Sequence, residues 1–348
     1  MKKETKHATA GKILKWVGYL TAILSLCATI GGFAKYGYDK LRTRREVESL
    51  LSTEVLQLQS HDYGSAWQTL EHAAKLQPDS SKVREVQESL AMAWLEDIHE
   101  TENQKFSDVT QKLEPVLTAA VTSMKPGPER ADVRAHIGWA YFLASRDGRF
   151  DLDPAVPYAA AIAEDPNNPY AQAMWGHWIL WQDCEKVTEA GTHFASAMAA
   201  KRKGDYVRQL QLAALLNCHN DEAEVETIRV ANAMRAEQRN VDEWSRSHIL
   251  GVYTELVYDP NGSEAKGIVN AVPAAEHLAT FHWLVDSVDS KSPKSLSRKY
   301  YLAVLEEAAG QKDKALEDYR AVLKELSGRS GSLLNSTDAA VKRLSRSR

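Results

Sequence analysis

Apolar residues recur every three to four positions through most of the chain, the spacing that lines one face of an α-helix. In the stretch HDYGSAWQTLEHAAKLQPDS, Ala66 and Ala73 stand seven apart with Leu70 between them, and Pro78 follows. A proline lacks a backbone donor and cannot continue a helix, so this stretch predicts a helix that ends before Pro78. No run shows the two-residue alternation between turn residues that is typical of a strand. The pattern therefore predicts an all-α protein.

The order small, large, small along a helix recurs several times. Its further occurrences are Ala190, Phe194 and Ala197, then Ala315, Tyr319 and Val322, and a shorter version in Tyr158, Ala161 and Pro166. The helices that come before these carry a small residue too, namely Gly138, Gly176 and Ala303. A glycine inside a helix costs roughly 1 kcal/mol relative to alanine. Gly138 and Gly176 therefore predict points where a neighbouring backbone approaches closely.

These residues resemble the tetratricopeptide repeat (TPR) family, in which each repeat is a pair of antiparallel helices. The resemblance implies a TPR-like α-solenoid of about seven helix pairs over residues 46–334, followed by a capping helix and basic tail in residues 335–348. Each pair would bury its apolar face only against its neighbours. The repeat-packing positions would be Ala66, Ala73, Gly138, Gly176, Ala190, Ala197, Ala303 and Ala315.

Four repeats begin near residues 46, 130, 169 and 295, and weaker signatures lie between them. The weaker pairs would be 81–100 with 106–123, 205–217 with 221–238, and 241–258 with 273–288 across the turn DPNGS. Longer connections than the family's tight turn occur at RDGRFDLDP and before Pro273. The register within 80–130 and 203–290 therefore stays open.

In the family, first helices line a concave groove that holds a protein or peptide partner. The positions that match its groove-facing residues are Trp139, Phe142, Leu143, His177, Leu180 and Trp181. Trp139 and Trp181 would be the anchors, since buried aromatic residues dominate many interfaces. The alternative is that Trp175, Trp178 and Trp181, spaced three apart, form a core stripe.

Residues 16–34, WVGYLTAILSLCATIGGFA, carry no charge. At about 1.5 Å per residue they nearly match a bilayer core of about 30 Å, and aromatic residues stand at both ends. We expect a single transmembrane helix between a basic tail, 1–15, and a basic juxtamembrane linker, 35–45. A cleaved signal peptide ending near Gly32-Phe33-Ala34 is the competing interpretation.

The side of the cell membrane that residues 46–348 face is undetermined, because five basic residues precede the span and five follow it. Small residues four apart, Gly18 with Ala22 and Ala28 with Gly32, leave self-association through the anchor open. Cys27 lies in the span. Cys184 and Cys218 are expected as buried thiols that would pair in an oxidising compartment.

The 348-residue chain has a net charge of only -4, but its charged residues are distributed unevenly along it. The first 45 residues hold 10 Lys or Arg against 2 acids, and the remainder holds 33 against 45, a net charge of -12. An acidic body opposes nucleic-acid binding. The sequence has no phosphate-binding, dinucleotide, hydrolase or CxxC motif, so we expect no catalytic residues and no cofactor.

Glu96 and His99 have the spacing of a carboxylate metal site but lack a matching helix, so no metal site is predicted. The sequence therefore predicts a membrane-anchored scaffold or adaptor that is not an enzyme. A holdase-like chaperone or assembly factor for exported or membrane proteins is the alternative, and a catalytic or metal-dependent role is less favoured.

Overall fold

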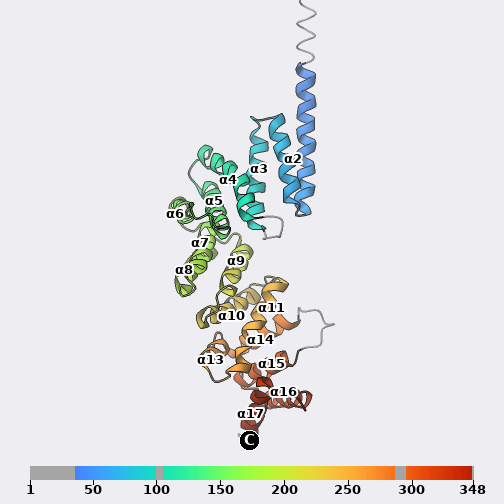
Figure 1. The fold of residues 1–348 in the computed structure, drawn as a ribbon, viewed down its shortest axis with the longest axis vertical. Helices are drawn as coiled ribbons and strands as arrows, with labels where there is room; N and C mark the ends of the chain where they lie inside the picture. The colour runs from blue at the N-terminus through green and yellow to red at the C-terminus, as the bar shows by residue number, and fades with distance from the viewer. Residues whose placement is uncertain (1–35, 99–104, 287–294, 347–348) are drawn as a thin grey trace, which may run out of the picture. The chain divides into compact units, whose positions relative to one another are not determined.

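The computed structural model describes residues 36–98, 105–286 and 295–346. All regular secondary structure in these ranges is helical, which confirms the all-α part of the predicted fold class (Figure 1). The predicted basic tail and the predicted span, residues 16–34, lie outside the described residues. Among the helices in the described ranges, none is both long enough and apolar enough to cross a bilayer.

The chain divides into two compact units, Met1–His99 and Glu100–Arg348. The described part of the first unit holds a helix over residues 36–59, α2 (Tyr63–Leu76) and α3 (Ser81–Glu96). The first of these helices includes residues 36–45 of the predicted juxtamembrane linker without interruption. As predicted, α2 ends before Pro78, and Ala66, Leu70 and Ala73 are fully buried on its inner face.

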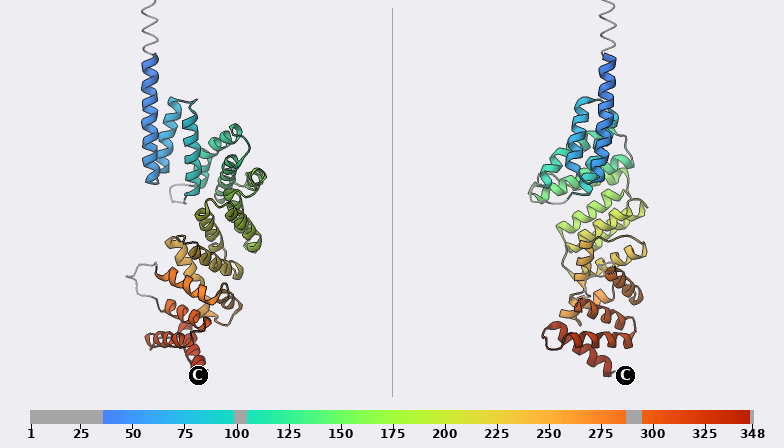
Figure 2. Two further views of the ribbon diagram at one scale, coloured as in Figure 1. Left: turned by 180° about the vertical axis from the view of Figure 1, so that it is seen from behind. Right: turned by 90° about the vertical axis from the view of Figure 1, so that its right-hand side faces the viewer.

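The second unit is a succession of helices that mostly pack against their neighbours in sequence (Figure 2). The pairs α5–α6, α7–α8, α9–α10 and α15–α16 are in contact, and α5, α7 and α9 also lie side by side. This is the arrangement of a helical-repeat protein. The helices are α4 (Phe106–Ser123), α5 (Pro128–Arg146), α6 (Ala155–Glu164), α7 (Pro169–Gln182), α8 (Val187–Ala199), α9 (Gly204–Leu216), α10 (Asp221–Ala236), α11 (Glu243–Val252), α12 (Glu255–Tyr258), α13 (Ser263–Val269), α14 (Ala274–Asp286), α15 (Leu296–Ala308), α16 (Lys312–Glu325) and α17 (Ser332–Arg346).

Local sequence sets where these helices begin. The side chains of Asn168 and Asn220 accept hydrogen bonds from the backbone N–H groups of Ala171 and Ala223, which caps α7 and α10. Asparagine caps in this way because a helix leaves its first backbone donors unpaired. Pro169 occupies the first turn of α7, where no backbone donor is needed.

The small residues lie where helices cross. Beside Gly176 on α7 are the ring of Phe194 and the backbone oxygen of Ala190, and a Cβ added to Gly176 would stand 3.1 Å and 3.2 Å from them. This is the close backbone approach that the sequence predicts. Gly138 differs, because the neighbour is the ring of Tyr158 instead of a backbone. All six alanines at the repeat-packing positions are fully buried: Ala66, Ala73, Ala190, Ala197, Ala303 and Ala315.

The predicted pairing of residues 241–258 with 273–288 is replaced by a more complex arrangement. The first segment forms α11 and the short α12, and α13 is inserted in the connection that follows. Both α13 and α14 pack against α10, and α14 also packs against α15. Tyr253, just beyond α11, makes ring contacts with His277 and Phe281 of α14.

The last helix covers the end of the second unit. α17 begins at Ser332, three residues before the predicted start at Asn335, and packs against α16, α12 and α15. Ala340 and Leu344 are buried against these helices, while basic residues occupy its last turn. A last helix with one buried face and one polar face is what the sequence predicts for a cap, because the end of a helical-repeat array needs a polar outer surface.

Candidate functional site

The residues predicted to line a groove gather into one aromatic cluster on α5 and α7. The rings of Trp139 and Phe142 have centroids 4.9 Å apart. The ring of His177 lies edge-on to both, at 5.1 Å and 5.3 Å, and the ring of Trp181 lies edge-on to Phe142 at 5.7 Å. We call Trp139, Phe142, His177 and Trp181 the α5–α7 aromatic cluster.

The predicted groove residues differ in how much of each is exposed to solvent. Trp181 is 45% exposed, whereas the other five are at most 8% exposed: Trp139, Phe142, Leu143, His177 and Leu180. These five are buried within the fold, so Trp181 is the one member of this set with a large solvent-exposed area. An exposed indole on a rigid aromatic base is the kind of anchor that binding interfaces use.

Arg146, at the end of α5, lies beside Trp181. Its guanidinium carbon is 4.9 Å from the Trp181 ring centroid and 4.8 Å from that of Phe106 on α4. Such cation–π contacts contribute about 0.5–1 kcal/mol at exposed sites. Sequence analysis missed both residues. Arg146 follows Phe142 by four positions, a spacing that puts it on the same helix face, but nothing in the sequence placed Phe106 there.

His177 is a neutral residue in this setting. Burial, with a smaller effect from the Arg146 charge, lowers the pKa of His177 to about 3. Its Nδ1 atom is buried and has no hydrogen-bond partner. His177 thus acts as an uncharged packing ring beneath Trp181 at neutral pH.

The other two tryptophans of the α7 stripe make internal contacts. Trp175 stacks on Tyr158 of α6 at 6.2 Å and on His193 of α8 at 5.2 Å. Trp178 is half-buried and packs against the apolar core. The core interpretation therefore describes Trp175 and Trp178, while Trp181, on the same helix, is exposed.

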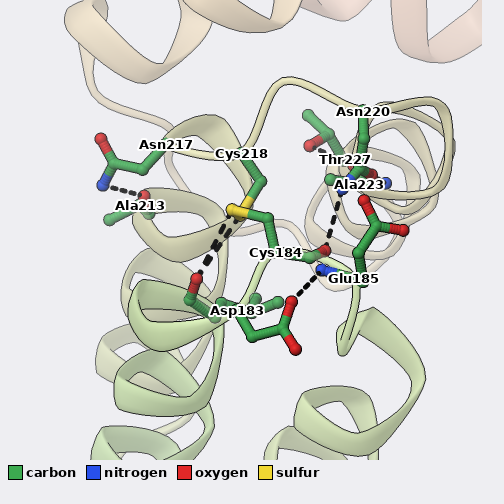
Figure 3. The surroundings of a disulfide bond; sticks show 10 residues. Asp183, Cys184, Glu185, Ala213, Asn217, Cys218, Asn220, Ala223 and Thr227 are labelled. Carbon is green, nitrogen blue, oxygen red and sulfur yellow. Dashed lines mark hydrogen bonds between the residues drawn. A yellow bond between two sulfur atoms is a disulfide. The ribbon is translucent and has the colours of Figure 1, made fainter.

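Close to Trp181, a disulfide links the ends of α7 and α9 (Figure 3). Cys184 and Cys218 are bonded with their Cα atoms 5.5 Å apart. The amide of Asn220 donates a 2.9 Å hydrogen bond to the backbone oxygen of Cys184, so the same two loops are joined twice. The sequence left open whether these cysteines pair, and the structure joins them.

Among the residues that the structure describes, no group of three or more His, Cys, Asp or Glu side chains could hold a metal ion.

No family model and no curated protein matches the chain. One similar solved structure is a tetratricopeptide repeat protein from Parabacteroides merdae, with 13% sequence identity over 86% of this chain and 99% of that chain, and a TM-score of 0.40.

Proposed function

We propose that this chain is a membrane-anchored scaffold whose helical-repeat domain binds a protein partner at the surface around Trp181. The single observation that carries the proposal is the exposure of Trp181 above the otherwise buried α5–α7 aromatic cluster. Its support is rigid, because the rings beneath it are held by two packed helices and by neighbouring repeats. Rigid exposed aromatic residues bind with little loss of side-chain entropy.

Arg146 adds a charge next to this anchor. A partner that carries a carboxylate or an aromatic ring would find both a cation and an indole within a few ångströms. Residues 16–34 would hold the domain at the membrane surface, which would concentrate it near membrane-bound partners. A protein scaffold needs no reacting groups, and the cluster offers none with a shifted pKa suited to catalysis near neutral pH.

The disulfide suggests which compartment contains the domain. Disulfides persist in oxidising compartments and are rare in the reducing cytosol. We therefore place the repeat domain on the oxidising side of the cell membrane and the basic tail, residues 1–15, on the cytosolic side. Protease protection in intact cells tests this orientation: digestion of the domain from outside supports it, and full protection contradicts it.

Binding is tested with a photo-crosslinking residue at position 182, next to Trp181, in living cells. A defined crosslinked partner should be recovered from the wild-type background and lost when Trp181→Ala is added. Tyr258→Ala is the matched control, because Tyr258 is also an exposed aromatic residue but lies on α12. Equal crosslinking with both variants contradicts the proposal.

A holdase would behave differently in the same preparation. It would suppress aggregation of unrelated unfolded proteins and would crosslink to many of them instead of one or two. Holdase activity requires a broad apolar surface. In the described part of the second unit, the exposed large apolar residues are spread over separate elements: Phe150, Val156, Trp181, Trp244 and Tyr258. This dispersion favours the specific scaffold.

A further inference from the structure

A second surface feature, distinct from the α5–α7 aromatic cluster, is an open cavity of about 350 Å³ between α9, α10 and α11. This volume is at the lower end of the range of about 300–1,000 Å³ that ligand sites occupy. Its floor is apolar, with Leu215, Leu216 and Val252. Its polar lining comprises His219, Glu224, Thr227, Ser247, His248 and Thr254.

Three of the six polar side chains in this lining already make hydrogen bonds to the backbone. Thr227 and Thr254 donate their hydroxyls to backbone oxygens within their own segments, and His248 Nδ1 hydrogen-bonds to the backbone oxygen of Trp244. Glu224 is different, because its Oε2 atom is buried and meets no N–H or cationic donor of the chain, and its side chain interacts instead with the carboxyl group of Glu264. A buried oxygen without a donor is a costly arrangement that a bound donor would relieve.

The charge around Glu224 has one sign. Its own helix contributes Asp221, α12 contributes Glu255, and α13 contributes Glu264, and all three interact with it electrostatically. Among the ion pairs of the described residues, none involves Asp221, Glu224, Glu255 or Glu264. Burial and then the neighbouring Glu264 raise the pKa of Glu224 to about 8. A positive charge in the cavity would compensate this concentration of carboxylates.

An aromatic face lies next to the cavity. The ring of Trp244 packs at a tilt against His248 with centroids 4.0 Å apart, and about half of Trp244 remains exposed. A long aliphatic stem can lie along such a ring while its charged end reaches a carboxylate. Lysine and arginine side chains combine such a stem with a cationic end.

We propose that the cavity between α9, α10 and α11 receives a lysine or arginine side chain of the protein partner, with the cationic group at Glu224. The inference rests on the proposed scaffold function and specifies the partner's chemistry: a basic residue for this cavity, in addition to whatever contacts Trp181. Because a bound cation favours the ionised carboxylate, binding releases a proton from Glu224.

Glycine positions allow the cavity to be filled without disturbing the fold. A Cβ added at Gly251, which lines the cavity, would meet nothing within 4 Å. The leucine side chain introduced by Gly251→Leu is therefore expected to fill part of the cavity. Gly191→Leu is the matched control, because Gly191 is equally open but lies on α8, away from the cavity lining. Glu224→Gln removes the charge, and Glu243→Gln is its control on the exposed first turn of α11.

The test uses the full-length chain in mild detergent and a fluorescent decapeptide with four lysines separated by glycine and serine. Fluorescence anisotropy should show binding that weakens at high salt. Gly251→Leu and Glu224→Gln should each weaken it at least tenfold, and both controls should leave it unchanged. Binding should also weaken from pH 8.5 to pH 6, as Glu224 gains its proton. The other titratable groups around it are His219 and His248 in the lining, and Asp221, Glu255 and Glu264 beside Glu224.

Several outcomes overturn the proposal. No binding at millimolar peptide, equal binding of a norleucine version, or equal binding to Gly251→Leu would each remove the basic-side-chain assignment. Calcium or zinc alone raising the melting temperature of wild type but not of Glu224→Gln would assign the cavity to a metal. Trp181→Ala should leave the lysine peptide bound, so a failure at Trp181 and a failure at this cavity are distinguishable.

Discussion

The ring of Tyr158 occupies the space in which a side chain at Gly138 would begin. An ideal Cβ on Gly138 would stand 2.5 Å from Tyr158 Cε1, closer than real Cβ contacts allow. Tyr158 is fully buried on α6, and its ring also stacks on Trp175 of α7. The glycine thus allows three consecutive helices to share one ring.

This relationship predicts that Gly138→Ala destabilises the second unit. In an open helical position the same change stabilises by up to about 1 kcal/mol, but here the Tyr158 ring must move within a packed core. We expect a net loss of about 1–3 kcal/mol, the usual cost of overpacking, measured by urea unfolding followed by circular dichroism. Gly191→Ala is the control and should not destabilise. Equal or greater stability of Gly138→Ala would contradict the role given to Tyr158.

The disulfide gives the second prediction. Cys184 and Cys218 are 34 residues apart, and the chain-entropy model gives about 3–4 kcal/mol for closing a loop of that length. Replacing either cysteine with serine should lower the free energy of unfolding by an amount in this range. A reductant should lower the free energy of unfolding of the wild-type protein by a similar amount. Mass spectrometry after alkylation without reductant measures the bond directly. Two alkylated thiols at these positions in protein from the native compartment would contradict it.

The sequence predicts the repeating part of this fold well, because each helix signal is local. Ala66, Leu70 and Ala73 lie on one face by their spacing alone, and Pro78 ends α2 through its own chemistry. The register of the region from α11 to α14 stays open in the sequence for the opposite reason. The short helices α12 and α13 have too few turns to show a period, and only their contacts with α10, α15 and α17 define their places.

The candidate site is predictable to a similar extent. Repeat register brought Trp139, Phe142, His177 and Trp181 onto adjacent helices, and the rings do meet. The repeat register does not predict which of these rings is exposed, because exposure depends on which rings are covered by α4 and the end of α5. The cavity at Glu224 left no sequence signal, because its lining comes from three helices and two loops whose spacing follows from packing.

Buried histidine gives the third prediction. The pKa of His177 is about 3 in the folded chain and near 6.5 when unfolded. The unfolded state therefore binds more protons between these values, so stability is full above pH 6.5 and falls as pH is lowered. By linkage, His177 should lower the free energy of unfolding by about 2 kcal/mol as the pH falls from 7.5 to 5.

His177→Leu should remove that part of the acid sensitivity, which urea unfolding at the two pH values would show. Some sensitivity should remain, because burial also lowers the pKa of His277 to about 4. His72→Gln, at an exposed position, is the control and should keep the wild-type pH dependence. A variant at residue 177 with the same acid slope as wild type would mean that His177 is protonated in the folded chain.

Glu224 gives the last prediction, with the opposite pH direction. Its pKa is about 8 when folded, and an unfolded glutamate titrates near 4.5. Between these values the folded state binds more protons, so its contribution to stability is full below pH 4.5 and is lost as pH rises toward 8. Glu224→Gln keeps the shape of the protonated side chain but cannot ionise. At pH 8 this variant should therefore be more stable than wild type by about 1 kcal/mol, after allowance for solvent screening of a half-exposed group.

The comparison needs both ends of the pH range. At pH 4.5 wild type and Glu224→Gln should unfold at nearly the same urea concentration, and the difference should appear only as pH rises. Glu243→Gln should show no such divergence. A Glu224→Gln variant that is less stable than wild type at pH 8 would mean that the ionised carboxylate already has a favourable partner. The local excess of negative charge, on which the basic-side-chain assignment depends, would then be absent.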